Sequence, residues 1–179
     1  MIIIHQALVH EALLLTELAR NIYKEYYLHL WHTGGAEWYM EEYAYSSDAI
    51  KKDLTDLNIE YFIAVEDGSP VGYMKIVLNS PFEADENMNA LEVERIYLTK
   101  KVTGRGLGRQ FMELALRKAL ELKKDIIFLK AMDSSKDAIE FYKRLGYTVC
   151  GSLQLPLPAF SVMKKEYRGM VILKKRVEE

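Results

Sequence analysis

The sequence predicts an α+β (α/β) domain in which a central mixed, mostly antiparallel sheet is flanked by helices. Three observations predict this fold. Apolar residues recur at helical spacing in the first third of the chain, two apolar runs flank Asp67-Gly68, and a later strand leads through a glycine turn into a helix and another strand. The 179 residues, half of them hydrophobic, are enough for one sizeable core, so we expect a single domain over residues 1–179.

The amino-terminal third is predicted to be mostly helical. After a short apolar run, from about Glu11 onward, apolar residues follow one another at three- and four-residue steps. This spacing places them along one face of a helix that ends near Gly34. The elements predicted here are a strand at residues 2–8 and helices at about 11–34, 36–45 and 47–57.

The remaining two thirds predict a hairpin followed by alternating strands and helices. The dipeptide Asp67-Gly68 is the strongest short hairpin signal in the chain, so the runs on either side of it should pair antiparallel. The strands are expected at residues 60–67, 70–79, 89–98, 125–132, 147–153 and 169–177. The helices are expected at residues 107–124 and 134–146.

Composition disfavours several classes of protein. The formal net charge of -2, with Lys and Arg scattered along the chain, shows no basic surface for nucleic acid. The single cysteine, Cys150, excludes an internal disulfide, and its apolar neighbours predict a buried strand thiol rather than a nucleophile. The first residues lack a basic flank and a cleavage site, and polar residues interrupt any spanning stretch. We therefore expect a cytoplasmic protein without a membrane segment.

The stretch "KVTGRGLGRQF", residues 101–111, has glycines at 104, 106 and 108 between a predicted strand and a predicted helix. Backbone N–H groups at such a turn point to one spot, and the helix dipole adds positive potential there. Arg105 and Arg109 can add charge, so a phosphate or pyrophosphate is the natural ligand. The alternative is a tight connection without a ligand. The spacing fits neither the Walker A motif nor the dinucleotide-binding fingerprint.

The turn "TGRGLG" resembles the signature Gln/Arg-x-x-Gly-x-Gly/Ala of the GNAT acetyltransferase superfamily. Two further stretches resemble the same family, "LEVERIYL" its central strand and "AIEFYKRLGY" its downstream helix. The order and spacing of these motifs agree with those of the family over residues 60–153. Among members, the chain is similar to bacterial spermine/spermidine acetyltransferases of the polyamine-control type. The resemblance implies a GNAT-type single domain with a splayed strand pair.

The resemblance implies acetyl-CoA as the acetyl donor, and no metal. Its pyrophosphate would bind the turn, and its pantetheine arm would pair with the central strand like an extra strand. Thr103 stands where the family usually has Gln or Arg, and Ser135 stands where it often has Asn. The implied cofactor-binding residues are Ile96, Tyr97, Leu98, Thr103, Gly104, Arg105, Gly106, Leu107, Gly108, Arg109 and Ser135.

Acetyl transfer to an amine needs a base and an acid. A substrate ammonium with a pKa of about 10.4 must lose its proton before it attacks. Glu92 and Glu94 should point to the same side of their strand, and the family register favours Glu92 as the base, acting through water or after burial. The alternative is an ion-paired carboxylate, for example with Arg95. Tyr142 is the candidate acid for the CoA thiolate, and its alternative is a core residue.

The acceptor site is less visible in the sequence. Residues 31–45 mix aromatic side chains with carboxylates, which suits a polyamine, but an amphipathic helix with an aromatic core side explains them equally. The candidate substrate-binding residues are Trp31, Glu37, Trp38 and Glu41. His29 and His32 could share a helix face as metal ligands, but no third ligand is spaced with them.

Three functions follow from these features. The first is an N-acetyltransferase for a small primary amine such as spermidine or spermine. The second is an acetyltransferase for a protein, peptide or amino-acid amine, and the third is a CoA-binding regulator that transfers nothing. A homodimer is a candidate assembly, with residues 169–177 as a candidate pairing edge.

Overall fold

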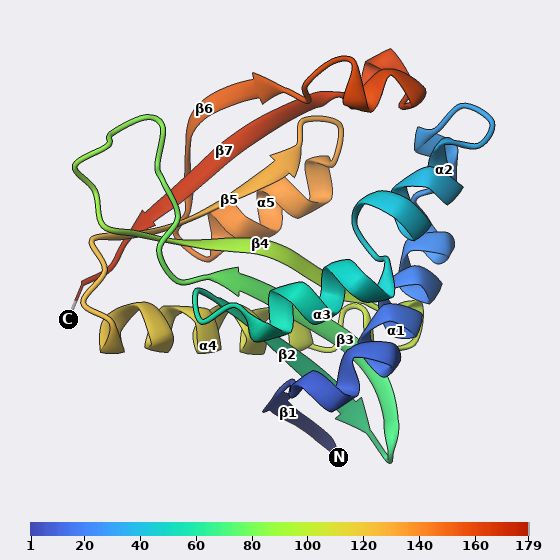
Figure 1. Ribbon diagram of the computed structural model, residues 1–179. Helices are drawn as coiled ribbons and strands as arrows, with labels where there is room; N and C mark the ends of the chain where they lie inside the picture. Colours follow the sequence, from blue (N-terminus) through green and yellow to red (C-terminus); the bar gives the residue numbers. More distant parts are fainter. Residues whose placement is uncertain (179) are drawn as a thin grey trace.

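The computed structural model describes residues 1–178, which form one seven-stranded sheet with helices on both faces (Figure 1). The strand order is β1-β2-β3-β4-β5-β7-β6, and every neighbouring pair is antiparallel except β4 and β5. The mixed, mostly antiparallel sheet expected from the sequence is confirmed. The strands are β1 (Ile2–Gln6), β2 (Ile59–Glu66), β3 (Ser69–Val77), β4 (Ala90–Leu98), β5 (Ile126–Met132), β6 (Thr148–Gln154) and β7 (Gly169–Arg176).

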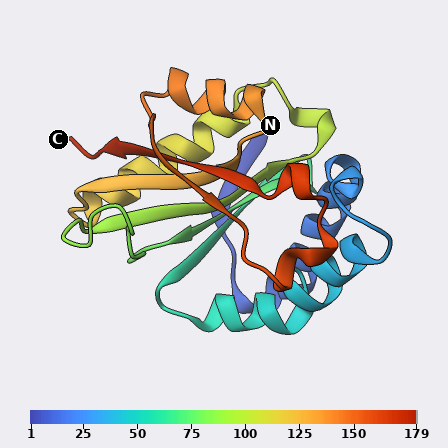
Figure 2. The same ribbon diagram turned by 90° about the horizontal axis from the view of Figure 1, so that it is seen from above.

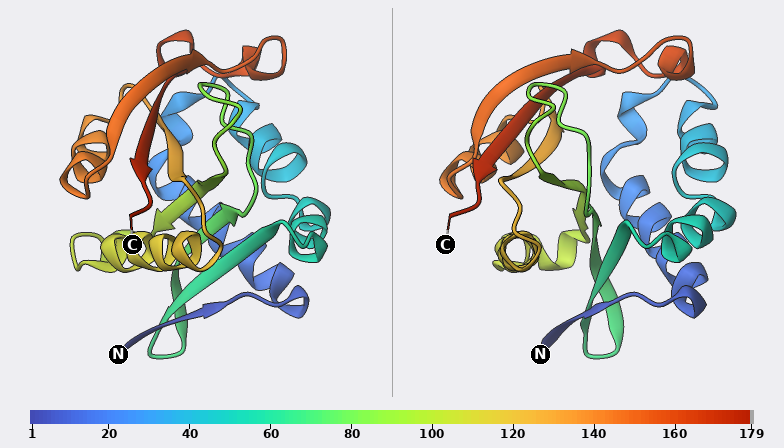
Figure 3. Two further views of the ribbon diagram at one scale, coloured as in Figure 1. Left: turned by 90° about the vertical axis from the view of Figure 1, so that its left-hand side faces the viewer. Right: turned by 60° about the vertical axis from the view of Figure 1, so that its left-hand side comes forward.

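The helices lie in two layers, one on each face of the sheet (Figure 3). One core joins the sheet to α4 and α5 and contains Phe111 and Tyr142, and a second core joins it to α1 and α3 and contains Leu15 and Ile50. The α-helices are α1 (Ala12–Tyr26), α2 (Gly35–Trp38), α3 (Ser47–Thr55), α4 (Leu107–Glu121) and α5 (Lys136–Arg144). A π-helical turn, η3 (Tyr39–Tyr43), follows α2.

The β2–β3 hairpin confirms the clearest local prediction. Asp67 and Gly68 have φ angles of 50° and 82°, the left-handed pair that a two-residue hairpin turn needs. The predicted length of the first helix is wrong, because α1 ends at Tyr26. Residues 28–30 form a short 3-10 turn, and the backbone beyond it bonds to the segment between β6 and β7 instead of continuing the helix.

The pairing of β4 with β5 ends early, and the two strands then separate. Only three residue pairs are in register, from Ala90–Ile126 to Glu92–Phe128. Beyond Glu92, β4 continues along β3, while β5 continues along β7 (Figure 1). The splayed pair implied by the family resemblance is therefore present, and it leaves one backbone edge of β4 facing open space.

Two expectations about the carboxyl-terminal strands need correction. The strand predicted as a pairing edge is β7, which is hydrogen-bonded to β5 on one side and β6 on the other, so it is an inner strand. The edges of the sheet are β1 and β6. Cys150 lies in β6 as predicted, but it is only half-buried because that strand is an edge, and its thiol faces the carbonyl of Ile172 at 3.5 Å.

Within residues 1–178, none of the helices has the length and apolar character needed to cross a membrane.

Candidate active site

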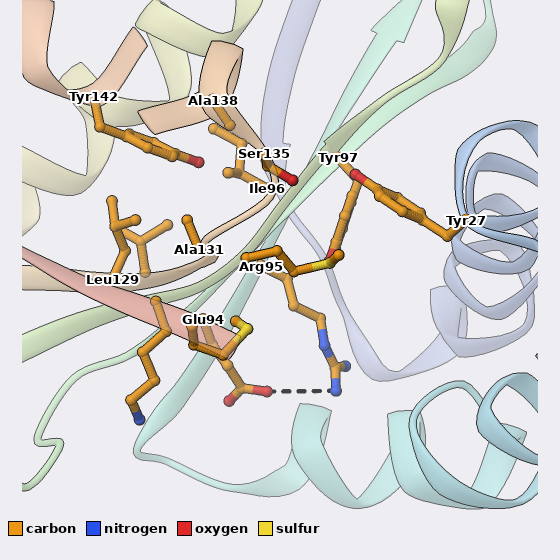
Figure 4. Close-up of a pocket in the computed structure, with 14 residues that line it drawn as sticks. Tyr27, Glu94, Arg95, Ile96, Tyr97, Leu129, Ala131, Ser135, Ala138 and Tyr142 are labelled. Atoms are coloured by element: carbon orange, nitrogen blue, oxygen red, sulfur yellow. Dashed lines mark ion pairs between the residues drawn. The ribbon is translucent and has the colours of Figure 1, made fainter. Parts of the chain in front are cut away.

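A cavity of about 140 Å³ lies where β4 and β5 separate (Figure 4). Because the sheet is open here, side chains from both of its faces line one space. Tyr142 enters from α5 on one face, and Glu94 and Tyr27 enter from the other. This cavity is called the splay pocket below.

The glycine turn lies next to the splay pocket and forms a second, larger cavity of about 450 Å³. Gly104 and Gly106 have φ angles of 80° and 84°, and an added Cβ at either would meet no atom within 4 Å. A larger residue would have room at either position, so glycine is needed here for its left-handed backbone conformation. The first backbone bond of α4 runs from the Gln110 N–H to the Gly106 carbonyl, so the amides of residues 107–109 lie before it and are available to an anion.

Gly108 has a different role from the other two glycines. A Cβ at this position would lie 3.3 Å from Cζ of Phe141, so the missing side chain lets α5 pack closely against the start of α4. Both helices line the turn cavity together with Ile96 and Leu98. The side chain of Leu107 is fully buried, and Leu107 is not among the residues that line the turn cavity.

The two arginines of the turn point in different directions. Arg109 lines the turn cavity, whereas Arg105 pairs with Glu66 at the end of β2 and is not among its lining residues. Thr103, at the position where the family has a longer side chain, lines the cavity and donates its hydroxyl hydrogen to the Thr99 carbonyl, 3.1 Å away. Its oxygen also lies 3.1 Å from the hydroxyl of Tyr26, which ties the turn to α1.

Glu92 and Glu94 occupy different environments although they lie on the same strand. Glu92 is buried, accepts a hydrogen bond from the Ser80 hydroxyl at 2.6 Å and pairs with Lys130 at 3.2 Å. It is not among the residues that line the splay pocket, whereas Glu94 is. β4 has a bulge at Glu94, since Val93 pairs with Ile76 and Arg95 pairs with Lys75, and the bulge places Arg95 on the same side of the sheet as Glu94.

Glu94 belongs to a row of charged residues, of which the sequence suggested only the pairing with Arg95, as an alternative to catalysis. Lys75 lies 2.8 Å from Asp53 of α3 and 3.0 Å from Glu94. Arg95 lies 3.4 Å from the other oxygen of Glu94 (Figure 4). Tyr61 donates its hydroxyl hydrogen to Asp53 at 2.7 Å. The alternation of polar and apolar residues in β3, "YMKIV", was the only signal that Lys75 would face this side of the sheet. We call Asp53, Lys75, Glu94 and Arg95 the charged row.

Tyr142 is almost fully buried on α5, and its hydroxyl points into the splay pocket toward Ile96 and Ser135 (Figure 4). Burial raises the pKa of Tyr142 well above its usual range. The phenol therefore stays protonated at neutral pH. Ser135 lines the same pocket immediately before α5.

The aromatic segment predicted to bind substrate lies apart from the splay pocket. Trp31 is buried and donates its indole hydrogen to the Tyr23 hydroxyl at 3.0 Å, and Trp38 packs 6.0 Å from the ring of Phe160. Glu37 and Glu41 are exposed on α2 and η3. The splay pocket is lined by none of these four residues. Their predicted role as substrate ligands therefore stays a prediction.

Two segments that are far apart in the sequence, residues 28–34 and 155–168, lie side by side and are called the arch (Figures 2 and 3). The His32 N–H donates to the Val162 carbonyl at 3.0 Å, and the Lys164 N–H donates to the Leu30 carbonyl at 2.9 Å. A Cβ on Gly35 would lie 2.8 Å from the Val162 oxygen, so this glycine permits the close approach. Trp31 and Trp38 therefore pack against residues 155–168 of the arch.

The histidine pair considered as a metal site also belongs to the arch. His29 packs edge-on against Tyr167, and His32 is exposed. Among residues 1–178 no three His, Cys, Asp or Glu side chains gather in a way that could hold a metal ion.

The sequence profile of the acetyltransferase (GNAT) family matches residues 17–147, which include the turn, β4, β5 and α5. The chain belongs to the acetyltransferase (GNAT) family. The prediction drawn from the glycine turn and its two companion motifs is thereby confirmed. The family's splayed strands and glycine turn correspond to the two joined cavities described above.

Relatives with curated descriptions match this GNAT chain over about half of its length. An uncharacterised N-acetyltransferase of Lactobacillus delbrueckii is 38% identical over 88 residues, which cover 49% of this chain and 50% of the relative. The spermine/spermidine N(1)-acetyltransferase of Bacillus subtilis is 25% identical, again over 88 residues, covering 49% of this chain and 58% of the relative. The matched region thus spans about half the length of these relatives.

Solved structures resemble this GNAT fold over nearly the whole chain. The PaiA N-acetyltransferase of Thermoplasma acidophilum in complex with coenzyme A superposes with a TM-score of 0.76 at 17% identity, covering 98% of this chain and 99% of that one. The ribosomal-protein-S18-alanine N-acetyltransferase of Escherichia coli gives 0.69 at 13% identity, covering 100% and 96%. At these identities the similarity establishes the fold.

Proposed function

We propose that this protein transfers an acetyl group from acetyl-CoA to a primary amine, by direct attack within a ternary complex. The observation that carries the proposal is the opening in the sheet. It brings the phosphate-binding turn and Tyr142 from one face, and Glu94 from the other, to a single pair of joined cavities. Donor and acceptor can then meet at the splay without leaving the protein.

The chain offers acetyl-CoA a complementary surface. The free amides of residues 107–109 and the side chain of Arg109 would bind the pyrophosphate, with Gly104 and Gly106 shaping the turn. The backbone of residues 96–98 borders the opening left by β5, so the amides of the pantetheine arm would pair with it. Ser135 and Ala138 lie opposite this edge. The thioester would then sit at the splay.

The transfer forms a C–N bond and breaks a C–S bond. The acceptor amine must first lose a proton, which costs roughly 4 to 5 kcal/mol at neutral pH for a pKa of about 10.4. Glu92, reached through water beside Lys130, would accept that proton. Tyr142 would donate its phenolic proton to the departing thiolate of CoA.

A small cationic amine such as spermidine is the acceptor that the site supports best. The rings of Tyr27 and Tyr97 and the carboxylate of Glu94 line the splay pocket, and aromatic faces and carboxylates both attract ammonium groups. The Bacillus subtilis relative is named for the same class of amine.

Thiol release from acetyl-CoA tests the proposal. Spermidine, a free amino acid and a lysine-containing peptide would be compared at equal concentrations, with product masses measured after each reaction. We expect release that depends on spermidine and a product heavier by one acetyl group. Release with the peptide alone would contradict the small-amine acceptor, and binding of acetyl-CoA without release for any amine would contradict acetyl transfer.

A further inference from the structure

The charged row runs from α3 to the wall of the splay pocket, and its exposure changes along the way. The Glu94 side chain is 32% exposed, whereas those of Arg95 and Lys75 are 13% and 7% exposed. Both positive members of the row are thus less exposed than the carboxylate. Glu94 is the carboxylate among the residues that line the pocket, and Arg95 and Lys130 line it as well.

The surroundings of Glu94 suit an ammonium group. Tyr27 and Tyr97 line the same pocket, with ring centres 5.6 Å apart. A carboxylate beside aromatic faces binds an alkylammonium through a charge-assisted hydrogen bond and through cation–π attraction. Glu94 and the two tyrosines therefore offer groups that can bind an ammonium.

Lys75 fixes the orientation of Glu94. Its ammonium group lies within 3.1 Å of both carboxylate oxygens of Glu94, and Asp53 holds the same ammonium from the other side. The Tyr61 hydroxyl in turn holds Asp53. Because Lys75 is buried, this geometry is much more restricted than that of a surface ion pair.

An ammonium bound to Glu94 is not the group that reacts. A nearby negative charge favours the charged form of an amine, and the attacking amine must be neutral. The acceptor then needs two nitrogen groups, one held as an ammonium at Glu94 and one placed at the splay near Tyr142.

We propose that Glu94 anchors the unreactive ammonium of a diamine or polyamine, and that Lys75 is the positioning residue that holds Glu94 for this task. The proposal rests on the proposed acetyl transfer and specifies how its acceptor is chosen. It assigns Glu94 to recognition and leaves proton transfer to Glu92.

Steady-state thiol release with two matched amines tests this assignment. Putrescine and butylamine have the same carbon chain and differ in one terminal ammonium. For Glu94→Gln we expect the KM for putrescine to rise about tenfold or more, with kcat within about twofold of wild type, and the KM for butylamine to change less than about twofold. Lys75→Met should raise the KM for putrescine similarly, and the double variant should add nothing further.

The matched control is Glu60→Gln, because Glu60 pairs with Lys118 at 2.9 Å on the α4 face of the sheet, outside the splay pocket. It should leave both KM values unchanged. Circular dichroism shows which variants fold, and Asp53→Asn tests the row with a smaller change if Lys75→Met does not fold. A Glu94→Gln variant that loses kcat equally with both amines would overturn the anchor role of Glu94. If the effects of Glu94→Gln and Lys75→Met on the KM for putrescine add in the double variant, the positioning role of Lys75 is overturned.

The failure of the anchor is distinguishable from failure of the proposed function. Equal kcat/KM for putrescine and butylamine in the wild type would remove the anchor and leave acetyl transfer intact. Absence of thiol release with every amine, despite binding of acetyl-CoA, would remove acetyl transfer itself.

Discussion

Arg105 donates hydrogen bonds from its two terminal nitrogens to the two carboxylate oxygens of Glu66, at distances of 3.2 and 2.6 Å. The pair links the glycine turn to the end of β2, and Lys101 adds a third contact at 3.3 Å. Hydrogen bonding from Arg105, helped by Lys101, lowers the pKa of Glu66 to about 2. Arg105 therefore stabilises the contact between the turn and β2, while Arg109 lines the turn cavity.

This ion pair predicts a specific dependence of stability on acid. A carboxyl group whose pKa is lowered by folding stabilises the native state above its unfolded pKa of about 4.3, and that contribution is lost as the pH falls toward 2. Thermal unfolding midpoints measured between neutral pH and pH 2 should fall more steeply for wild type than for Glu66→Gln. Parallel curves for the two proteins would show that the pair contributes nothing.

The two arginines should differ in their effect on the donor. Arg109→Ala removes the side chain that lines the turn cavity, so the KM for acetyl-CoA should rise about tenfold, the loss expected for one charge-assisted contact. Arg105→Ala, the matched control, should change this KM by less than about threefold while lowering the unfolding midpoint. The opposite ranking of the two KM values would mean that Arg105 leaves Glu66 to bind the phosphates.

Tyr142→Phe removes one hydroxyl that points into the splay pocket and keeps the buried ring. We expect kcat to fall about tenfold or more with little change in either KM, which is the pattern for a group that acts in the transition state. Because burial raises the pKa of Tyr142, wild-type kcat should show no loss from this residue on the alkaline side up to about pH 9. Tyr147→Phe, a buried tyrosine outside the pocket, is the control. An unchanged kcat in Tyr142→Phe would exclude the acid role.

Gly106 should be required for its conformation. At a φ of 84°, alanine costs about 1 to 2 kcal/mol even though its Cβ has room, and asparagine tolerates this region better. Denaturant unfolding should therefore rank the proteins as wild type, then Gly106→Asn, then Gly106→Ala. If alanine is as stable as wild type, the turn adopts another backbone conformation. The KM for acetyl-CoA, measured in the same variants, reports whether the amides of residues 107–109 keep their direction.

Local patterns determined much of this protein from its sequence alone. The hairpin at Asp67-Gly68 and the glycine turn need only the preferences of a few consecutive residues, and both are present where predicted. The family followed from three short motifs in the right order, and those motifs include the strand and the helix that carry Glu94 and Tyr142. The roles proposed for these two residues, and the extent of the single domain, stay predictions.

Tertiary structure decided what depends on contacts between distant residues. The position at which β2 ends decides that Arg105 of the turn pairs with Glu66, 39 positions away in the sequence. The segment between β6 and β7 decides that Trp31 packs inside the arch. The bulge that places Arg95 on the same side of the sheet as Glu94 depends on the register with β3. Sequence periodicity describes one element at a time, whereas ion pairing and strand register arise only when elements pack together. The sequence therefore determined which chemical groups the protein carries, and packing decided which of them share a pocket.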